Sequence, residues 1–421
     1  MSALTRERPV ARSRELTALL AMSMALSALG IDLMLPGFGA IRRGLGLPPD
    51  STAVTGLVTS YFVGLAAGQL IYGPLADRFG RRSSLYLSYG IYAAGALAAA
   101  LSPTLALLLV SRFVWGLGAA GQRVITTAVV RDLYEGEAMS RALSLILAVF
   151  LLVPVLAPTL GAGIVAVASW RWMFVLCVVA VALMALWAVR LPETLRDEHR
   201  RPLRFRPVTQ AARVVVSHRG TVGYTLAITA LFGALAGYLG SAEAIFGQTF
   251  NRPGSFPLYF GGLAAIMAAT MLISARIVGR VGTRRLAHTV LAIFPVAAGA
   301  LAGVALVTDG RPPLALFLIG MAVMTACHGV LLPNLNTLAM GPMAEVAGTA
   351  SSVIGAVQLG GGALVGALLD RAFDGTVRPM ALGYFATAVL ALASVAWGQR
   401  GRLSRQPSAV VATDAITSSG A

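Results

Sequence analysis

The sequence lacks lysine altogether, has only two cysteines, Cys177 and Cys327, and carries a charged side chain at 12% of its 421 positions. Two cysteines inside long apolar stretches imply neither a disulfide framework nor a thiolate metal site. No histidine is spaced from a cysteine or glutamate as metal ligands are. A GxxxxGK[ST] phosphate-binding loop and a paired nucleophile and base are also absent from the sequence. We therefore expect no metal, no cofactor, no direct use of ATP and no enzymatic activity.

Apolar residues dominate what is present: 57% of the chain is hydrophobic, and its mean hydropathy is +0.78. A water-soluble core does not need that much apolar side chain, so a lipid bilayer is the expected solvent. A membrane-spanning helix needs about 20 mostly apolar residues. The sequence predicts an all-α membrane protein with twelve such helices, roughly at residues 16–38, 52–75, 84–102, 104–129, 142–166, 170–190, 220–245, 257–279, 286–308, 313–337, 347–369 and 379–399.

The positive charge follows the predicted topology. With the N-terminus inside, 24 of the 33 arginines fall in the cytoplasmic loops and tails and seven in the outer loops. This bias is the positive-inside pattern of membrane proteins, so the net charge of +16 does not indicate nucleic-acid binding. Both ends are predicted to be cytoplasmic. The first span follows Arg12 and Arg14, but it is too long for a signal peptide and contains Asp32.

The spans divide into two sets of six. We expect a cytoplasmic N-terminal tail at 1–15, a six-helix bundle at 16–190, a cytoplasmic linker at 191–219, a second bundle at 220–399, and a disordered cytoplasmic tail at 400–421. The linker is rich in arginine and proline and is expected to be partly helical.

The two halves repeat one another. "GPLADRFGRRSSL" follows the second span and "ARIVGRVGTRRLA" follows the eighth. Aligning Gly80 with Gly282 also aligns Arg78 with Arg280 and Arg82 with Arg284. Repeats of this kind in a membrane protein indicate a transporter whose halves rock around a central site.

The stretch "GPLADRFGRR", at residues 73–82, is expected to be a gating turn between spans 2 and 3. Gly73 lets another helix approach closely, and Pro74 and Gly80 shape the ends of the turn. Asp77 can meet a helix N-terminus or an arginine across the seam between the halves. Ion pairs that form and break there suit a two-state gate, and topology alone does not explain the aspartate or the glycines. The remaining charged residues, expected to face lipid head groups or carboxylates, are Arg78, Arg81 and Arg82.

At these residues the chain resembles the major facilitator superfamily, and within it the Bcr/CflA group of bacterial drug/proton antiporters. The matching stretches are "GIDLMLPGF", "GQLIYGPLADRFGRR", "SRFVWGLGAAG", "VVRDLYEG" and "LAPTLGAGI". The resemblance covers the first half well, whereas the second half matches mainly by hydropathy and by "RVGTRRL". It implies two six-helix bundles in the bacterial inner membrane, a central cavity, and alternating access driven by proton entry.

The same resemblance implies roles for several residues. Asp32 falls where these exporters keep a membrane carboxylate, and Arg112 falls on their buried arginine of span 4. Pro158 and Gly161 lie in the antiporter signature of span 5, which reads "APTLGA" here instead of the usual "GP..GG". With Pro154, Pro158 is also expected to kink this span.

Charges inside the apolar spans are the strongest indication of a site, because a charge at the bilayer centre is costly unless it faces a cavity or a partner. Arg112 and Arg123 are eleven residues apart and share a helix face, about 16 Å apart along the axis. Gly116 and Ala119 lie between them, which predicts the wall of a roomy, polar cavity. The alternative is that both arginines extend toward the membrane surfaces.

Asp32 is the predicted coupling carboxylate, on a stripe of small residues in span 1. Burial favours the neutral form of a carboxyl group and a nearby arginine favours the charged form, so Asp32 could bind a proton and a cationic drug in turn. An interfacial structural acid is the alternative. Glu243, near the outer end of span 7, is either a second coupling group or an exposed residue at the mouth.

Other polar and aromatic residues are candidates for the cavity lining. Hydrogen bonding between helices is the more common role for the polar ones, and lipid packing for the aromatic ones. The candidates are Tyr61, Trp115, Gln122, His328, Asn334, Asn336 and Gln358. Phe150 is a further candidate for stacking on an aromatic drug.

The sequence thus predicts a monomeric exporter of small lipophilic drugs, driven by proton entry. In the predicted cycle, the drug displaces a proton from Asp32, the halves rock, and protonation of Asp32 outside releases the drug. An exporter or importer of an endogenous metabolite is the alternative.

Overall fold

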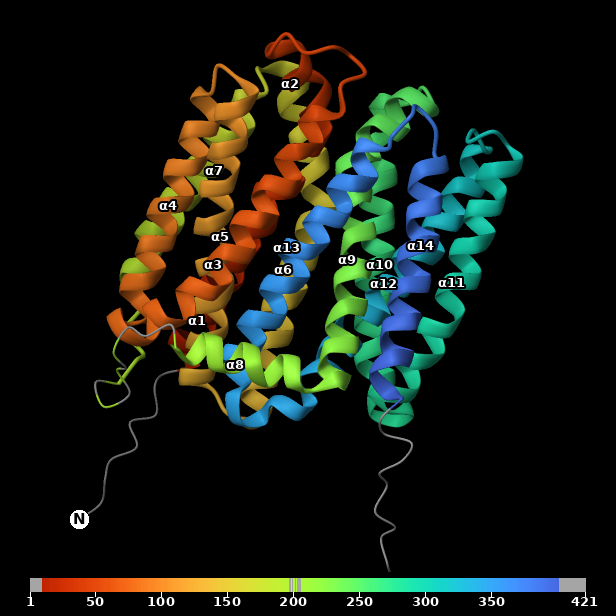
Figure 1. The fold of residues 1–421 in the computed structure, drawn as a ribbon. Helices are drawn as coiled ribbons and strands as arrows, with labels where there is room; N and C mark the ends of the chain where they lie inside the picture. Colours follow the sequence, from red (N-terminus) through yellow and green to blue (C-terminus); the bar gives the residue numbers. More distant parts are fainter. Residues whose placement is uncertain (1–9, 197, 199, 201, 203–205, 401–421) are drawn as a thin grey trace, which may run out of the picture.

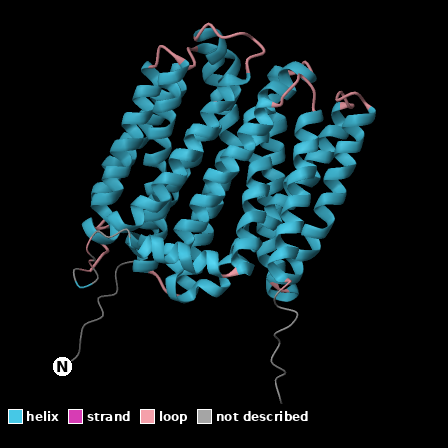
Figure 2. Ribbon diagram, viewed as in Figure 1, coloured by secondary structure: helices cyan, strands magenta, loops and turns pink. Residues whose placement is uncertain are grey.

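A computed structural model describes residues 10–196, 198, 200, 202 and 206–400. The described residues fold into helices joined by loops, and no strand occurs among them (Figure 2). Twelve helical segments in this part of the chain are long and apolar enough to cross a membrane. The predicted all-α class and the twelve predicted spans are therefore confirmed. The predicted tail at 400–421 lies almost wholly outside the described residues.

Fourteen α-helices make up the described part of the chain (Figure 1). The first seven are α1 (Val10–Asp32), α2 (Phe38–Gly44), α3 (Gly56–Phe79), α4 (Arg81–Leu101), α5 (Leu105–Leu133), α6 (Gly136–Val167) and α7 (Arg171–Trp187). The others are α8 (Arg206–Ser217), α9 (Arg219–Ala244), α10 (Phe256–Val281), α11 (Thr283–Val307), α12 (Leu314–Met340), α13 (Ala347–Arg371) and α14 (Arg378–Gln399). Of the shorter helical turns, η1 (Leu35–Gly37), η2 (Thr52–Thr55) and η7 (Gly341–Val346) matter for the site.

The helices pack as two groups. Helices α1 to α7 contact mainly one another, and so do α9 to α14 (Figure 1). The main contacts between the groups are α3 with α13 and α6 with α10. Counted as membrane spans, these contacts join span 2 to span 11 and span 5 to span 8. Span 2 corresponds to span 8 in the other half, and span 5 to span 11, so exchanging the halves turns one contact into the other. This is the contact pattern of two structural repeats facing each other across a pseudo-two-fold axis.

The repeat is visible in the backbone. Gly80 separates α3 from α4 at φ 94°, and Gly282 separates α10 from α11 at φ 86°. An L-residue with a side chain rarely adopts such a positive φ, which glycine adopts without strain. The alignment of Gly80 with Gly282 is therefore confirmed as a shared helix–glycine–helix junction.

The stretch at 73–82 is not a ten-residue turn, as predicted. Helix α3 continues to Phe79, with Pro74 inside it, and the break is at Gly80 alone. Hydropathy predicts where the chain leaves the hydrocarbon core of the membrane, not where a helix ends. Helix α3 continues beyond that point, because charged side chains such as Asp77 can be hydrated in the head-group layer. Pro74 consequently does not shape an end of the turn.

The linker contains α8, which lies across one end of the spanning helices (Figure 1) and packs on α13 and α9. A partly helical linker is what the sequence predicts. We call this end of the molecule the linker face. The opposite end, which carries α2 and η2, is called the far face.

Candidate functional site

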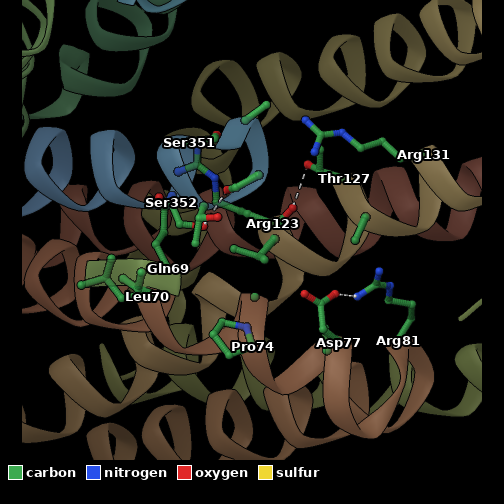
Figure 3. A pocket seen from close by; sticks show the side chains of 18 of the residues that line it. Gln69, Leu70, Pro74, Asp77, Arg81, Arg123, Thr127, Arg131, Ser351 and Ser352 are labelled. Carbon is green, nitrogen blue, oxygen red and sulfur yellow. Dashed lines mark hydrogen bonds and ion pairs between the residues drawn. The ribbon is translucent and has the colours of Figure 1, made fainter. Parts of the chain in front are cut away.

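A cavity of about 640 Å³ lies between the two helix groups. Its walls come from α3 and α5 on one side and from η7 and the start of α13 on the other, and the linker residues Pro202 and Val208 also line it. The cavity therefore belongs to the linker face. Its volume is in the range of pockets for drug-sized ligands, roughly 300–1,000 Å³. Figure 3 shows polar side chains from both groups pointing into it.

Charged side chains of the first group form a network at the edge of this cavity (Figure 3). The Arg81 guanidinium donates to Asp77 Oδ1 at 2.7 Å and to Asp132 Oδ2 at 2.9 Å. Asp132 also accepts a hydrogen bond from Thr194 Oγ1 at 3.1 Å. One buried arginine is thus shared by two carboxylates. Of the two environments expected for Arg81, lipid head groups or carboxylates, the structure shows carboxylates. Among the described residues Asp77 forms its ion pair within the first group and not across the seam.

Glu193, from the segment after α7, caps the start of α4. Its carboxylate accepts from the backbone N–H of Arg81 at 2.8 Å and of Arg82 at 3.2 Å. A carboxylate at a helix N-terminus is stabilised by the free N–H groups and the helix dipole. An added Cβ on Gly80 would lie 2.3 Å from Glu193 Oε2, so a side chain there would displace the capping carboxylate.

The other residues of the motif are less constrained. An added Cβ on Gly73 would lie no closer than 3.9 Å to Ser352 Oγ, so the close helix approach expected at Gly73 is not present in this conformation. Arg78 is exposed. Arg82 lies with its guanidinium carbon 5.9 Å from the Tyr86 ring centroid.

Arg123, from α5, lines the cavity. Its guanidinium carbon lies 5.7 Å from the centroid of the Phe150 ring. In the part of the chain that the structure describes, Arg123 forms no ion pair. Arg123 thus lies on a cavity wall and is not directed to the lipid surface in this conformation.

Arg112 has a different environment, although it shares a helix face with Arg123. It is fully buried, donates to the carbonyls of Gly30 at 2.7 Å and Leu57 at 3.3 Å, and lies against Tyr61 and Trp115, 4.3 and 4.7 Å from their ring centroids. Arg112 is not part of the cavity lining. The prediction that both arginines lie on one polar cavity wall is therefore wrong for Arg112.

The space beside Arg112 is closed by backbone contact. An added Cβ on Gly116 would lie 2.0 Å from the carbonyl oxygen of Tyr61. Small residues allow membrane helices to approach backbone to backbone. The small residues between the two arginines therefore form a packing seam between α3 and α5, and they do not enlarge a cavity.

Asp32, the last residue of α1, is buried and 5% exposed. Among the described residues it forms no ion pair, and Arg112 reaches the carbonyl of nearby Gly30 instead of the carboxyl group. Asp32 lies outside the lining of the 640 Å³ cavity. The next residue, Leu33, contacts α6, because an added Cβ on Gly161 would lie 2.0 Å from the Leu33 carbonyl oxygen.

At the far face, the two groups are joined by charge. Arg42 of α2 donates to Glu243 of α9 at 2.6 Å, and the side chains are 7% and 17% exposed. The expectation of an exposed Glu243 at the mouth is therefore wrong.

The C-terminal end of α13 carries a buried acid, Asp370. It is 1% exposed, and its Oδ1 has no hydrogen-bond partner among the described residues.

The seven candidate lining residues all lie outside the lining of this cavity. Tyr61, Trp115 and Gln122 are fully buried in the first group, and His328 lies between the carbonyls of Met324 and Leu231 at 2.9 Å each. Asn334 donates to Ser274 Oγ at 2.7 Å, which is the helix-to-helix bonding given as the alternative. Of the remaining two, Asn336 is exposed and Gln358 is half-buried.

Helix α6 continues unbroken through Pro154 and Pro158. Its contact with α10 brings it to the seam between the groups. Pro158 and Gly161 are buried, and Gly161 faces α1.

Four residues of these networks were not singled out from the sequence. Asp132 and Glu193 follow spans and look like ordinary solvated acids, Arg42 looks like a topology charge, and Asp370 ends an apolar span like an interfacial acid. Only the position of Asp132 within "VVRDLYEG" gave a signal, because that stretch carries the resemblance.

A helical membrane protein of two groups, with a cavity at one face and a cross-group ion pair at the other, has the architecture of a membrane transporter. The model of the Major Facilitator Superfamily matches residues 20–366, and the chain belongs to this superfamily. Its relatives group it with the Bcr/CflA-type drug transporters. Twelve spanning helices and bacterial relatives indicate a multi-pass protein of the inner membrane.

An uncharacterized MFS-type transporter of Bacillus subtilis is 31% identical over 379 residues, which cover 89% of this chain and 93% of the relative. A bicyclomycin resistance protein homolog of Haemophilus influenzae is 30% identical over 369 residues, covering 87% of this chain and 92% of the relative. A solved D-xylose-proton symporter superposes with a TM-score of 0.74 at 15% identity, over 92% of this chain and 97% of the symporter. The likeness to the symporter shows the fold alone.

Proposed function

We propose that the protein is a monomeric secondary transporter that exports small lipophilic drugs in exchange for protons, without a cofactor or an enzymatic step. The observation that carries this proposal is the asymmetry of the seam between the helix groups. A drug-sized cavity lies at the linker face, and the Arg42–Glu243 ion pair joins the groups at the far face. This is one of the two states that alternating access requires.

The distribution of arginines supports an assignment of the two faces to the two sides of the membrane. We assign the linker face and both termini to the cytoplasm, because 24 of the 33 arginines lie on that side of the predicted topology. The cavity then takes up its cargo from the cytoplasm. The chain's similarity to a bicyclomycin resistance protein homolog supports a small antibiotic-like cargo.

Asp32 is the proposed proton site. It is buried in the spanning part of α1 and forms no ion pair among the described residues. Ionisation of Asp32 therefore makes the position of α1 in the membrane less favourable, and protonation removes that cost. Because Asp32 lies outside the cavity lining, the drug does not need to displace the proton directly. Drug and proton instead act on the same rocking motion, each through its different affinity for the two states.

The test is drug accumulation in an efflux-deficient bacterium that expresses the chain. We expect low accumulation of labelled chloramphenicol, a rise when an uncoupler is added, and loss of the effect in Asp32→Asn. Asp50→Asn, which neutralises an exposed acid, is the matched control and should behave as wild type. Equal accumulation in expressing and empty cells would exclude chloramphenicol as cargo, and uncoupler-insensitive efflux would exclude proton coupling.

A further inference from the structure

We propose that the cavity binds a small organic anion, and that its negative group is held between Arg123 of α5 and the N-terminal turn of α13. This inference rests on the proposed function and names the substrate class of the same site. The cargo would be an amphiphile with an apolar body and one carboxylate-like group, and the cavity would disfavour organic cations.

The charges around the cavity identify Arg123 as the binding group. Among the side chains that the structure describes, five charged ones line the cavity: Asp77, Arg81, Arg123, Arg131 and Asp132. Both acids are engaged by Arg81, at 2.7 and 2.9 Å, and Arg131 is exposed. Among the side chains that the structure describes, this leaves Arg123 as the cation on the inner wall with no carboxylate partner.

An unpaired cation inside a spanning helix calls for a partner. A charge within the membrane is costly unless it faces a cavity or a counter-charge, and a guanidinium presents several N–H donors that match a carboxylate. The Phe150 ring, 5.7 Å from the guanidinium carbon, supports one face of the group without neutralising it. The N–H edge that faces the cavity is therefore the part that a bound anion would meet.

The opposite wall supplies a second anion-binding element. Residues Ala347, Gly348 and Thr349, in the first turn of α13, line the cavity, as do Ser351 and Ser352. The N-cap position holds Val346, which has no side-chain acceptor and makes no capping hydrogen bond. The first N–H groups of this 25-residue helix are thus not capped by a side chain, and such groups together with the helix dipole favour a negative charge.

The two elements come from different helix groups. Figure 3 shows Arg123 projecting from α5 on the side of the cavity where Ser351 and Ser352 of α13 lie. An anion bound between them would connect the groups at the linker face, where the structure holds them apart. Binding would thereby favour closure of that face, which is the step that a cytoplasmic cargo must trigger.

The remaining lining suits an apolar body. Leu70, Val124, Ala128 and Val346 lie on the same cavity. An aromatic acid of two fused rings fits this mixture of one charged spot and apolar walls, within about 640 Å³.

The experiment compares three probes of one shape on purified, detergent-solubilised protein by isothermal titration calorimetry: naphthoate, naphthamide and naphthylmethylammonium. We expect naphthoate to bind about tenfold to a hundredfold more tightly than naphthamide, the range for hydrogen bonds to a charged group, and the ammonium to bind most weakly. Arg123→Gln should abolish the preference for the anion. Arg141→Gln, an exposed arginine paired with Glu137 outside the cavity, should retain it.

Equal binding of the three probes to wild type, or tightest binding of the ammonium, would overturn the inference, and neither result requires a variant to fold. An unchanged preference in Arg123→Gln would also overturn it. Chloramphenicol efflux in the same variants separates this inference from the proposed function. Coupled efflux without an anion preference rejects the anion site alone. An Arg123-dependent preference without chloramphenicol efflux supports the anion site and excludes chloramphenicol as cargo, and uncoupler-insensitive efflux rejects proton coupling alone.

Discussion

At the scale of single residues, the contacts of Arg112 and Arg123 separate two uses of the same side chain. Arg112 joins three helices: it lies on α5 and donates to carbonyls of α1 and α3. Its flat guanidinium also stacks on two aromatic rings. Arg123 has the same charge but faces a cavity, so its partner is left to be supplied from outside the chain.

This difference predicts the effect of Arg112→Lys. A lysine keeps the charge but loses the planar fork, so it can reach only one of the two carbonyls and cannot stack in the same way. We expect a loss of about 2 kcal/mol of stability, the scale of one hydrogen bond from a charged group, measured as a lower unfolding temperature in detergent. Arg141→Lys, whose side chain is 78% exposed, is the control. An unchanged unfolding temperature in Arg112→Lys would show that charge alone matters there.

At the scale of elements, the contact between α6 and the end of α1 depends on one glycine. Gly161 lies where an added Cβ would come within 2.0 Å of the Leu33 carbonyl oxygen, beside Asp32. A backbone atom cannot move aside as a flexible side chain can. The spacing of α1 and α6 at the proposed proton site is therefore set by the absence of a side chain.

We expect Gly161→Ala to destabilise the protein by about 1–3 kcal/mol, as overpacking does, and to weaken uncoupler-sensitive efflux because α1 is displaced. Gly163→Ala, two residues along the same helix and facing open space, should be neutral or slightly stabilising, since alanine is the better helix former. Unfolding temperature and drug accumulation measured on both variants test this. Equal behaviour of the pair would contradict the proposed contact.

At the scale of the whole molecule, the structure is held closed at one face and hollow at the other. The Arg42–Glu243 pair crosses between the groups at the far face, whereas the Asp77–Arg81–Asp132 network stays within one group at the linker face. Rocking would break the first and bring new partners to the second. The balance between the two states therefore depends on few charged contacts.

We expect Glu243→Gln to shift the protein toward the state that is open at the far face, because removing one partner of a buried pair costs about 2–5 kcal/mol. The reporter is Thr55→Cys in η2, a position 8% exposed in this structure, with both native cysteines replaced by alanine. A membrane-impermeant maleimide added to cells should label the reporter faster in Glu243→Gln. The double exchange Arg42→Glu with Glu243→Arg should return labelling toward the wild-type rate.

Slower or equal labelling in Glu243→Gln would show that the ion pair does not hold the far face closed. Labelling only from the cytoplasmic side, in inverted vesicles, would reverse the proposed topology.

The sequence by itself determined the features that depend on local transfer free energy. Each apolar run must cross the bilayer as a helix, because no water is present there to satisfy the backbone, so twelve runs predicted twelve spans. The repeat was equally local, since Gly80 and Gly282 mark positions where only glycine adopts the required φ. The side of the membrane on which each loop lies could also be proposed from the sequence, because arginines in short loops favour the cytoplasmic side.

Only the tertiary structure decided which residues meet. Arg112 and Arg123 share one helix face and looked equivalent, but the backbone contact of Gly116 with Tyr61 buries one, and the separation of the groups at the linker face leaves the other beside a cavity. Likewise, the sequence leaves Glu243 open between a coupling group and an exposed residue, whereas in the structure Arg42, about 200 positions earlier in the chain, lies 2.6 Å away. Hydropathy and helical period fix which face a residue occupies, whereas the space in front of that face is set by helices that are distant in sequence.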